Sequence, residues 1–320
     1  MAKSDPDDWR PSAPVAALRL RADLKSEIRA FLSERDILEV DTPRIAGSAA
    51  TDPQITCFAV EGSRSHFWLI PSPEFHLKRL LCAGLGDIYS FGPVFRDEEW
   101  GPLHEPEFTL LEYYRMGMTG AALAEEVAGL LTRLLGEIGP VERISFAELF
   151  EGELGIDPFE APVQALWERV ATEHRDHLPR TDRGLLWDFF LGNVFYPRLG
   201  GKTIAVIHDF PAEQAALARL RPDNPLVSER FEIVVRGLEI ANGYHELNDP
   251  EEQIRRFEIE RRARARLGRA DVEPDTRYLQ ALDAGLPDCS GVAIGFDRIM
   301  LLATGAQTLS EVVAFPAARA

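Results

Sequence analysis

The chain contains 320 residues and has little cysteine, no long apolar run and no basic N-terminal segment. Its three cysteines, Cys57, Cys82 and Cys289, are far apart and lack the spacing of metal ligands, which is typical of a protein kept in a reducing cytoplasm. No apolar run approaches the roughly 20 residues that a membrane-spanning helix needs. The N-terminus is acidic and polar, the opposite of a secretory signal. These absences together predict a cytoplasmic protein with no membrane association.

Basic side chains are scarce relative to acidic ones: 35 Lys and Arg residues stand against 52 Asp and Glu, which gives a formal net charge of -17. Binding to nucleic-acid phosphates rests on clustered Lys and Arg. The composition therefore disfavours a protein that coats nucleic acid, while a local basic patch stays compatible with it. Repeats and low-complexity tracts are absent from the sequence as well. The 45% hydrophobic and 27% charged residues are ordinary for a globular enzyme.

Helices are predicted where apolar residues recur at helical spacing, and strands where they alternate or form short runs. Predicted helices cover residues 15–35, 72–84, 123–138, 249–268 and 299–303; predicted strands cover residues 37–43, 204–207 and 291–295, a hairpin at 231–240, and both sides of the loop at 96–106. Residues 1–14 are predicted to be a flexible lead-in, and residues 139–200 to hold short helical pieces without an assignable function. Hairpins flanked by helices predict an α+β fold, an antiparallel sheet with helices packed on it, in one domain over residues 15–320.

Two apolar runs between residues 94 and 115 carry Arg96 and several glutamates, with a charged loop between them. Ionic groups in buried strands cost free energy unless they are paired or bind something, so these runs predict one wall of a site for an anionic ligand. A guanidinium suits that task because its planar fork pairs two phosphate oxygens at once; a buried ion pair with a neighbouring glutamate is the alternative for Arg96. Arg298 follows a strand of small residues, which lets a nucleotide lie against the backbone.

These segments resemble the three motifs of class II aminoacyl-tRNA synthetases. Phe-Arg-Asp-Glu at 95–98 with Pro-Glu-Phe at 106–108 is similar to motif 2, Gly-Phe-Asp-Arg at 295–298 to motif 3, and the helix and strand over residues 15–43 to motif 1, the dimer interface of that family. The resemblance implies the class II catalytic-domain fold, ATP and Mg²⁺ as cofactors, and a homodimer. It implies catalytic roles for Arg96 and Arg298, a metal carboxylate at Glu239, and nucleotide contacts from Arg96, Asp97, Glu98, His104, Glu105, Phe108, Glu239, Ile240, Gly295 and Arg298.

A second set of residues resembles the lysine-recognition set of lysyl-tRNA synthetases: Ser72, Pro73, Glu74, Tyr114, Asn242 and Glu246. A cationic substrate needs anionic partners in a shielded pocket, and Glu74 and Glu246 are expected to supply charge at its two ends. Ala293 stands where lysyl-tRNA synthetases have glycine. One added methyl in a tight pocket shifts preference by about 1–3 kcal/mol, so Ala293 is expected to favour a differently branched lysine.

The first helix begins near residue 15, which leaves no room for the anticodon-reading barrel of lysyl-tRNA synthetases. In this respect the chain looks like the elongation factor P lysine ligase family. That resemblance implies ATP-dependent activation of (R)-β-lysine or lysine as an adenylate, transfer to a lysine ε-amine of elongation factor P, and no use of tRNA. Two alternatives stay open: a truncated lysyl-tRNA synthetase-like enzyme acting on tRNA, and a non-catalytic amino-acid-binding regulatory paralogue, which would be expected to lose Arg96, Glu239 or Arg298.

Three positions in the loop region depart from the family pattern. Asp97 and Glu105 each replace an asparagine, and Pro102 replaces a basic residue. Two extra carboxylates near a triphosphate would repel it unless Mg²⁺ or an arginine compensates. ATP affinity or the placement of this loop is therefore expected to differ from that of relatives.

Overall fold

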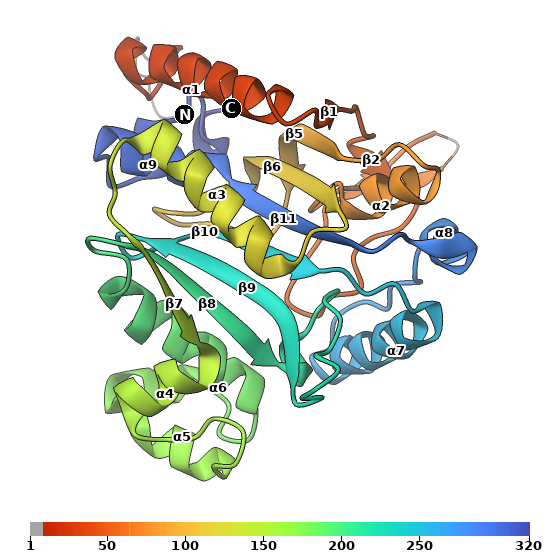
Figure 1. Ribbon diagram of the computed structural model, residues 1–320, viewed down its shortest axis with the longest axis vertical. Coiled ribbons are helices and arrows are strands. Elements are labelled where there is room, and N and C mark those ends of the chain that lie inside the picture. The colour runs from red at the N-terminus through yellow and green to blue at the C-terminus, as the bar shows by residue number, and fades with distance from the viewer. Residues whose placement is uncertain (1–8, 64) are drawn as a thin grey trace, which may run out of the picture.

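The computed structural model describes residues 9–63 and 65–320 (Figure 1). In this part of the chain, eight strands form one sheet in the order β1-β5-β6-β11-β10-β9-β8-β7. The neighbours from β5 to β8 are antiparallel, whereas β1 and β7 join the two edges in parallel. The strands are β1 (Leu38–Glu39), β5 (Ile88–Phe95), β6 (Glu107–Met116), β7 (Val141–Ser145), β8 (Ile204–Pro211), β9 (Val227–Val235), β10 (Leu238–His245) and β11 (Cys289–Gly295). The predicted α+β class is confirmed.

Three helices cover one face of this sheet: α1 (Val15–Ser33), α3 (Gly120–Leu135) and α9 (Phe296–Thr304) (Figure 1). Side chains from alternate positions of the central strands meet them, including Leu111, Tyr113 and Ile294, and all three are buried. Successive side chains of a strand point to opposite faces of the sheet. The residues that alternate with Leu111, Tyr113 and Ile294 therefore point to the other face. The main hydrophobic core therefore lies under α1, α3 and α9.

The other face is partly covered by α2 (Glu74–Cys82), α7 (Pro250–Arg266) and α8 (Thr276–Gly285). Their buried side chains pack around Tyr114 of β6, and α8 was not predicted from the sequence. The start of α2 is fixed by Ser72, whose hydroxyl accepts a hydrogen bond from the Glu74 backbone N–H at 3.0 Å. This bond satisfies one of the free N–H groups at a helix start. Ser72 and Glu74 are thereby held at the start of α2, beside Glu112 of β6, to which the Ser72 hydroxyl donates.

A group of short helices follows β7 and packs around β8 at one end of the molecule (Figure 1). It contains α4 (Phe146–Leu154), α5 (Val163–Arg169) and α6 (Arg183–Phe190), then a π-helix, η2 (Leu191–Phe195). Short 3-10 turns lie in this region and elsewhere in the described residues: η1 (Thr172–His177), η3 (Tyr196–Arg198), η4 (Ala212–Gln214), η5 (Leu309–Glu311) and η6 (Ala317–Arg319). Helical pieces were predicted in this region, but β7 was not.

The predicted hairpin is present in the structure, and the strand predicted over residues 37–43 is shorter than expected. The hairpin of β9 and β10 turns at Arg236 and Gly237, which have φ values of 49° and 81°. Positive φ at both central residues is the requirement of the two-residue turn that matches strand twist. The strand predicted over residues 37–43 is shorter, because only Leu38–Glu39 pairs with β5. A second, three-stranded sheet in the order β2-β4-β3 was missed, and its strands are β2 (Ile45–Ala46), β3 (Ala59–Glu61) and β4 (His66–Leu69).

The predicted flexible lead-in lies partly outside the described residues, which begin at Trp9. Its described part contacts the C-terminal segment, since the Ser12 N–H donates to the Ala314 carbonyl at 2.8 Å and Ala13 is buried. Within residues 9–63 and 65–320, none of the helices has both the length and the apolar character required to cross a membrane. The division into lead-in and catalytic domain, and the cytoplasmic location, stay predictions.

Candidate active site

A cavity of about 500 Å³ opens on the face of the sheet opposite α1, α3 and α9. Alternate residues of three adjacent strands form its floor, among them Glu112 and Tyr114 of β6, Ala293 of β11 and Asn242 of β10. The strand register places Ala293 directly between Glu112 and Asn242. The two-residue period that sends Leu111 and Tyr113 into the core thus sends the polar neighbours into the cavity.

A β-bulge in β10 brings an additional carboxylate to this cavity. The register with β9 shifts between Glu239 and Ala241, so Ile240 is the extra residue. Residues three apart point to opposite faces of a regular strand, whereas one inserted residue returns them to the same face. Glu239 and Asn242 accordingly both line the cavity.

The cavity brings together most of the residues that the sequence predicted for a site. Its lining includes Ser72, Glu74, Arg96, His104, Glu105, Phe108, Tyr114, Glu239, Ile240, Asn242, Glu246, Ala293, Gly295 and Arg298. Pro73, Asp97 and Glu98 are not part of the lining. Pro73 lies between two lining residues at the start of α2, and Glu98 is exposed and forms an ion pair with Arg269 at 2.8 Å.

One side of the cavity carries two guanidinium groups. Arg96 follows β5 and lies over the Phe108 ring at 5.0 Å, with an ion pair to Glu99 at 3.4 Å. Its Nε is buried and has no hydrogen-bond partner among the described residues. Arg298 lies in the first turn of α9 and donates to the Glu239 carbonyl at 2.7 Å. Both arginines line the cavity, and a guanidinium is the group that binds phosphate oxygens with two N–H donors at once.

His104 connects the loop after β5 to this guanidinium pair. Arg298 Nη2 donates to His104 Nε2 at 3.1 Å, which requires that ring nitrogen to be unprotonated. Burial lowers the pKa of His104, and the positive charge of Arg298 lowers it further although Glu99 opposes the shift. His104 is therefore a neutral imidazole at this position.

The opposite side of the cavity is anionic and surrounds a buried lysine. Lys78 Nζ lies 2.6 Å from Glu74 Oε1 and 2.6 Å from Glu246 Oε2. Burial lowers the pKa of Lys78, but the two carboxylates outweigh it and raise that pKa well above its usual value. The two glutamates were expected at the two ends of a substrate. They lie instead next to each other, because both contact the same ammonium.

Glu112 is a third carboxylate on this side of the cavity. It accepts hydrogen bonds from the Ser72 hydroxyl at 2.6 Å and the Tyr114 hydroxyl at 2.9 Å. Burial, and then the charge of Glu74, raise the pKa of Glu112 to about 8. Burial and Glu74 also raise the pKa of Glu246, while the ion pair with Lys78 opposes that shift. We assign the ionised state to Glu246 because it has the cation in contact, and the proton to Glu112.

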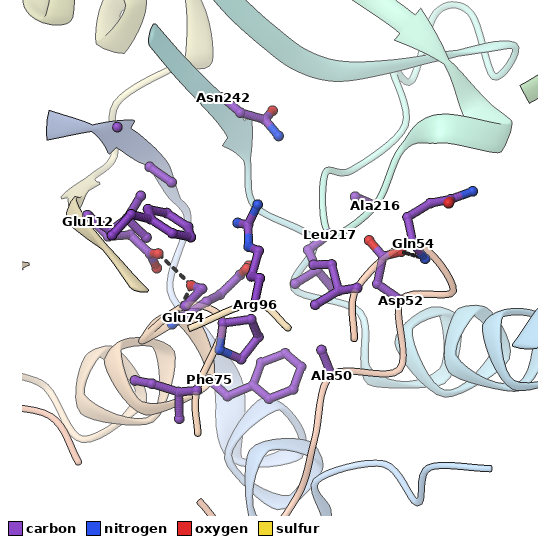
Figure 2. Close-up of a pocket in the computed structure, with 18 of the residues that line it drawn as sticks. Ala50, Asp52, Gln54, Glu74, Phe75, Arg96, Glu112, Ala216, Leu217 and Asn242 are labelled. Atoms are coloured by element: carbon purple, nitrogen blue, oxygen red, sulfur yellow. Dashed lines mark hydrogen bonds between the residues drawn. The ribbon is translucent and has the colours of Figure 1, made fainter. Parts of the chain in front are cut away.

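Figure 2 shows Glu74 and Glu112 on one side of the pocket, Asp52 and Gln54 on the other, and the Arg96 side chain between them. The segment carrying Asp52 is held by α7, since Arg264 donates to the Asp52 carbonyl at 2.9 Å. Thr51 in the same segment donates to the Glu260 carboxylate of α7. The cavity therefore joins an anionic pocket, a cationic wall and an outer arm under the loop of residues 48–55.

Sequence reasoning missed Lys78, Glu112 and Glu232. Lys78 is four residues after Glu74 on a helix, and that spacing puts both side chains on one face. Glu112 is two residues before Tyr114 on a strand, so it shares the face of a predicted site residue. Glu232 lies opposite Asn242 in the hairpin register. The spacings of Lys78 and Glu112 were usable signals once the secondary structure was assigned, whereas the pairing of Glu232 with Asn242 depends on the bulge at Ile240.

Glu239 and Glu232 are the carboxylates that decide whether the site fits a magnesium ion. Both line a smaller adjoining cavity, and the charge of Glu239 contributes to raising the pKa of Glu232 to about 7, after burial as the main cause. No group of three or more His, Cys, Asp or Glu side chains in residues 9–63 and 65–320 has metal-binding geometry. Mg²⁺ is usually held by one or two carboxylates together with substrate phosphates. The two glutamates fit that mode of binding.

Two of the departures from the family pattern have structural partners at the C-terminal end of the chain. Glu105 Oε2 accepts a hydrogen bond from the Ala317 N–H at 2.9 Å, and the Pro102 carbonyl accepts one from the Leu309 N–H at 2.8 Å. Asp97 does not line the cavity, and its N–H donates to the Thr56 carbonyl at 2.9 Å. These contacts hold the loop after β5 in place, and the hydrogen bond from Ala317 gives one of the two extra carboxylates, that of Glu105, a partner within the protein.

Comparison with known proteins gives a consistent set of similarities. Residues 8–319 match the family described as tRNA synthetases class II (D, K and N). Proteins named elongation factor P--(R)-beta-lysine ligase from Vibrio cholerae, Histophilus somni and Yersinia enterocolitica are 42%, 43% and 42% identical to the chain. The alignments cover 98%, 97% and 99% of this chain and 99%, 97% and 100% of those relatives.

Proposed function

The chain belongs to the class II tRNA synthetase family and, within it, to the elongation factor P (R)-β-lysine ligases, and from that membership we propose its reaction and the residues that perform it. The enzyme activates (R)-β-lysine with ATP to form an adenylate. It then transfers the lysyl group to a lysine ε-amine of elongation factor P. The protein is thus an ATP-dependent, AMP-forming ligase that makes an amide bond.

In the first step, a carboxylate oxygen of the amino acid attacks the α-phosphorus of ATP. The bond from that phosphorus to the bridging oxygen of the β-phosphate breaks, and pyrophosphate leaves. Arg96 and Arg298 hold phosphate oxygens and stabilise the charge that develops on them, which is the main contribution a protein makes to phosphoryl chemistry. Phe108 stacks on the adenine, next to the guanidinium that already lies over its ring.

Glu239, with Glu232 beside it, would hold Mg²⁺, which neutralises triphosphate charge when bound. The side chains of the protein do the remaining work. Glu74 and Glu246 bind the ammonium groups of the amino acid, with Ser72 and Tyr114 orienting Glu112 on the third side. The carboxylate of the amino acid is thereby directed at the cationic wall.

In the second step, the acceptor ε-amine, after losing its proton to solvent or to a nearby base, attacks the carbonyl carbon of the adenylate. The new C–N bond replaces the bond from that carbon to the phosphate oxygen, and AMP leaves with the electron pair. No further general acid or base on the leaving side is required, because AMP is a stable anion. Orientation of the two reactants supplies most of the rate in such a step.

The observation that carries the proposal is that one cavity holds both halves of the chemistry. Arg96 and Arg298 lie on one side, and the Glu74 and Glu246 carboxylates that contact Lys78 lie with Glu112 on the other. A phosphate-binding wall without the anionic pocket would fit any nucleotide-binding protein. The combination fits an amino acid with two ammonium groups that reacts with a nucleotide.

ATP–pyrophosphate exchange tests this reaction with the purified protein. We expect exchange that depends on (R)-β-lysine, weaker exchange with lysine, and none with leucine, which has similar bulk but lacks the second ammonium. The assay also tests the alternative of a non-catalytic paralogue, which would bind the amino acid without exchange. Exchange that is absent with every amino acid would reject the proposed activity.

We also propose a homodimer formed through the region of α1 and β1. Three apolar side chains in and near this region are unusually exposed: Val15 at 63%, Leu38 at 54% and Ile45 at 46%. An apolar surface of this kind is typical of a protein interface. Light scattering at micromolar concentration should give the mass of a dimer, and a monomer would count against this interface.

A further inference from the structure

We propose that Lys78 is a positioning residue for the amino-acid substrate, an internal counter-ion that holds Glu74 and Glu246 together and sets the net charge of the pocket to match a substrate with two ammonium groups. This inference rests on the proposed function and deepens it, because it concerns the same site. Lys78 does not line the cavity and is fully buried, at 0% exposure. It therefore acts on the substrate only through the carboxylates it contacts.

The contacts of Lys78 link two distant parts of the chain. Glu74 lies one turn earlier on α2, where the four-residue spacing brings the side chains together, and Glu246 follows the end of β10. A buried ammonium is expensive unless it is paired, and removing a partner from such a pair is strongly destabilising. The two 2.6 Å contacts satisfy Lys78 on the protein side of the pocket. They also fix which oxygen of each carboxylate is left for a ligand.

Glu246 has one carboxylate oxygen that does not contact Lys78. Its Oε2 forms the ion pair with Lys78 at 2.6 Å, while its Oε1 is buried and has no side-chain partner in the described part of the chain; the Gly291 backbone N–H is the protein group that faces this carboxylate. A side chain at Gly291 would reach this oxygen, since a Cβ there would lie 2.6 Å from Glu246 Oε1. Glycine at this position therefore keeps the oxygen open. A buried carboxylate oxygen without a partner is costly, and a ligand ammonium is the group that satisfies it.

The charges around Lys78 give the counting argument. Before the substrate binds, Glu112 holds a proton and Lys78 is protonated, so the set carries one net negative charge. When two substrate ammonium groups enter, Glu112 loses its proton, and Glu74, Glu112 and Glu246 together with Lys78 then carry two net negative charges, the number that the two ammonium groups neutralise. Without Lys78, the same three ionised carboxylates would carry three net negative charges. Their mutual repulsion would keep at least one of them protonated when the substrate binds. Among the described residues, the other titratable groups that interact with Lys78 are Cys82 on α2, Tyr278 on α8 and Cys289 on β11, and none of these is a second cation.

Direct binding of (R)-β-lysine, measured by calorimetry without ATP over a range of pH, tests the role of Lys78 independently of catalysis. In the wild type, affinity should rise with pH as the carboxylates ionise, and then level off. In Lys78→Met, we expect affinity at neutral pH to fall about tenfold or more, and the rise to move to higher pH because the remaining carboxylates repel one another. Lys202→Met, at an exposed lysine, is the matched control and should bind as the wild type does.

The double variant Lys78→Met/Glu246→Gln covers the case in which the single variant fails to fold. It removes both charges of one buried pair and restores two net negative charges, so the rise in affinity should return toward the wild-type pH even though affinity stays weak. A merely structural role for Lys78 would lower stability without moving the pH of that rise. An unmoved rise in the folded variants overturns the inference, and so does a wild-type protein that binds no diamino acid. Binding without pyrophosphate exchange would reject the proposed activity and leave Lys78 in its role.

Discussion

Replacing Gly291 by alanine should weaken amino-acid binding, because the new methyl group would enter the floor of the pocket. Its Cβ would lie 2.3 Å from a ring carbon of Tyr114 and 2.6 Å from Glu246 Oε1. Both distances are far below van der Waals contact, so one of the three groups must move. Gly291 itself is held by pairing of β11 with β6 and β10 on both sides. Tyr114 and Glu246 must therefore give way, and Glu246 is proposed to bind the substrate while Tyr114 orients Glu112.

The magnitude follows from overpacking of a buried site, which costs about 1–3 kcal/mol. Since about 1.4 kcal/mol is a factor of ten, we expect the KM for (R)-β-lysine to rise roughly tenfold or more in pyrophosphate exchange, with a smaller change in the KM for ATP. Gly129→Ala is the matched control, because Gly129 lies within α3 and no atom of the described residues lies within 4 Å of the Cβ that it would gain. Circular dichroism and the melting temperature separate misfolding from a local effect. A Gly291→Ala protein with wild-type KM would refute the geometry proposed for the pocket.

Three further variants test separate parts of the site. Arg298→Ala should reduce the rate of pyrophosphate exchange at least tenfold, about 1.4 kcal/mol or more, because contacts to phosphate are lost. Arg262→Ala, at an exposed arginine of α7, is the control and should keep the wild-type rate. Equal rates in the two variants would remove Arg298 from the catalytic set. Ala293→Gly should raise activation of α-lysine relative to β-lysine by removing one methyl from the pocket floor, and an unchanged ratio would place this selectivity elsewhere. Burial, together with the charge of Asp52, raises the pKa of Glu260 from 4.5 to about 7. Because the folded state holds this proton more tightly than the unfolded chain does, Glu260 contributes stability that is fully present below about pH 4.5. This stability is lost as pH rises through about 7. Glu260→Gln should flatten the fall in melting temperature over that range, and an equal slope in both proteins would contradict the assignment.

The parts of the site that could be predicted from the sequence are those in which function depends on short-range spacing. Ser72 and Glu74 at a helix start, Arg96 after a strand and Arg298 at the start of another helix all carry recognisable local patterns. The hairpin of β9 and β10 was predictable for the same reason, since Gly237 and alternating apolar residues lie within a few positions of one another.

The features that could not be predicted depend on contacts between distant segments or on small irregularities. Nothing local indicates that Lys78 meets Glu246, because the pair exists only when α2 packs beside the end of β10. The bulge at Ile240 changes which face Glu239 points to, and a regular alternation would have placed it wrongly relative to Asn242. Strand β7 has exposed Glu142 and Arg143 at a sheet edge, so it lacks the apolar alternation by which buried strands are recognised.

Mass spectrometry of intact elongation factor P tests the proposed reaction most directly. The factor is incubated with the purified enzyme, ATP, Mg²⁺ and (R)-β-lysine, and tRNA is supplied in a parallel reaction. We predict one added lysyl unit on the factor, dependent on ATP, and no charging of tRNA. Charged tRNA together with an unchanged mass of the factor would contradict the proposal and favour a synthetase-like enzyme.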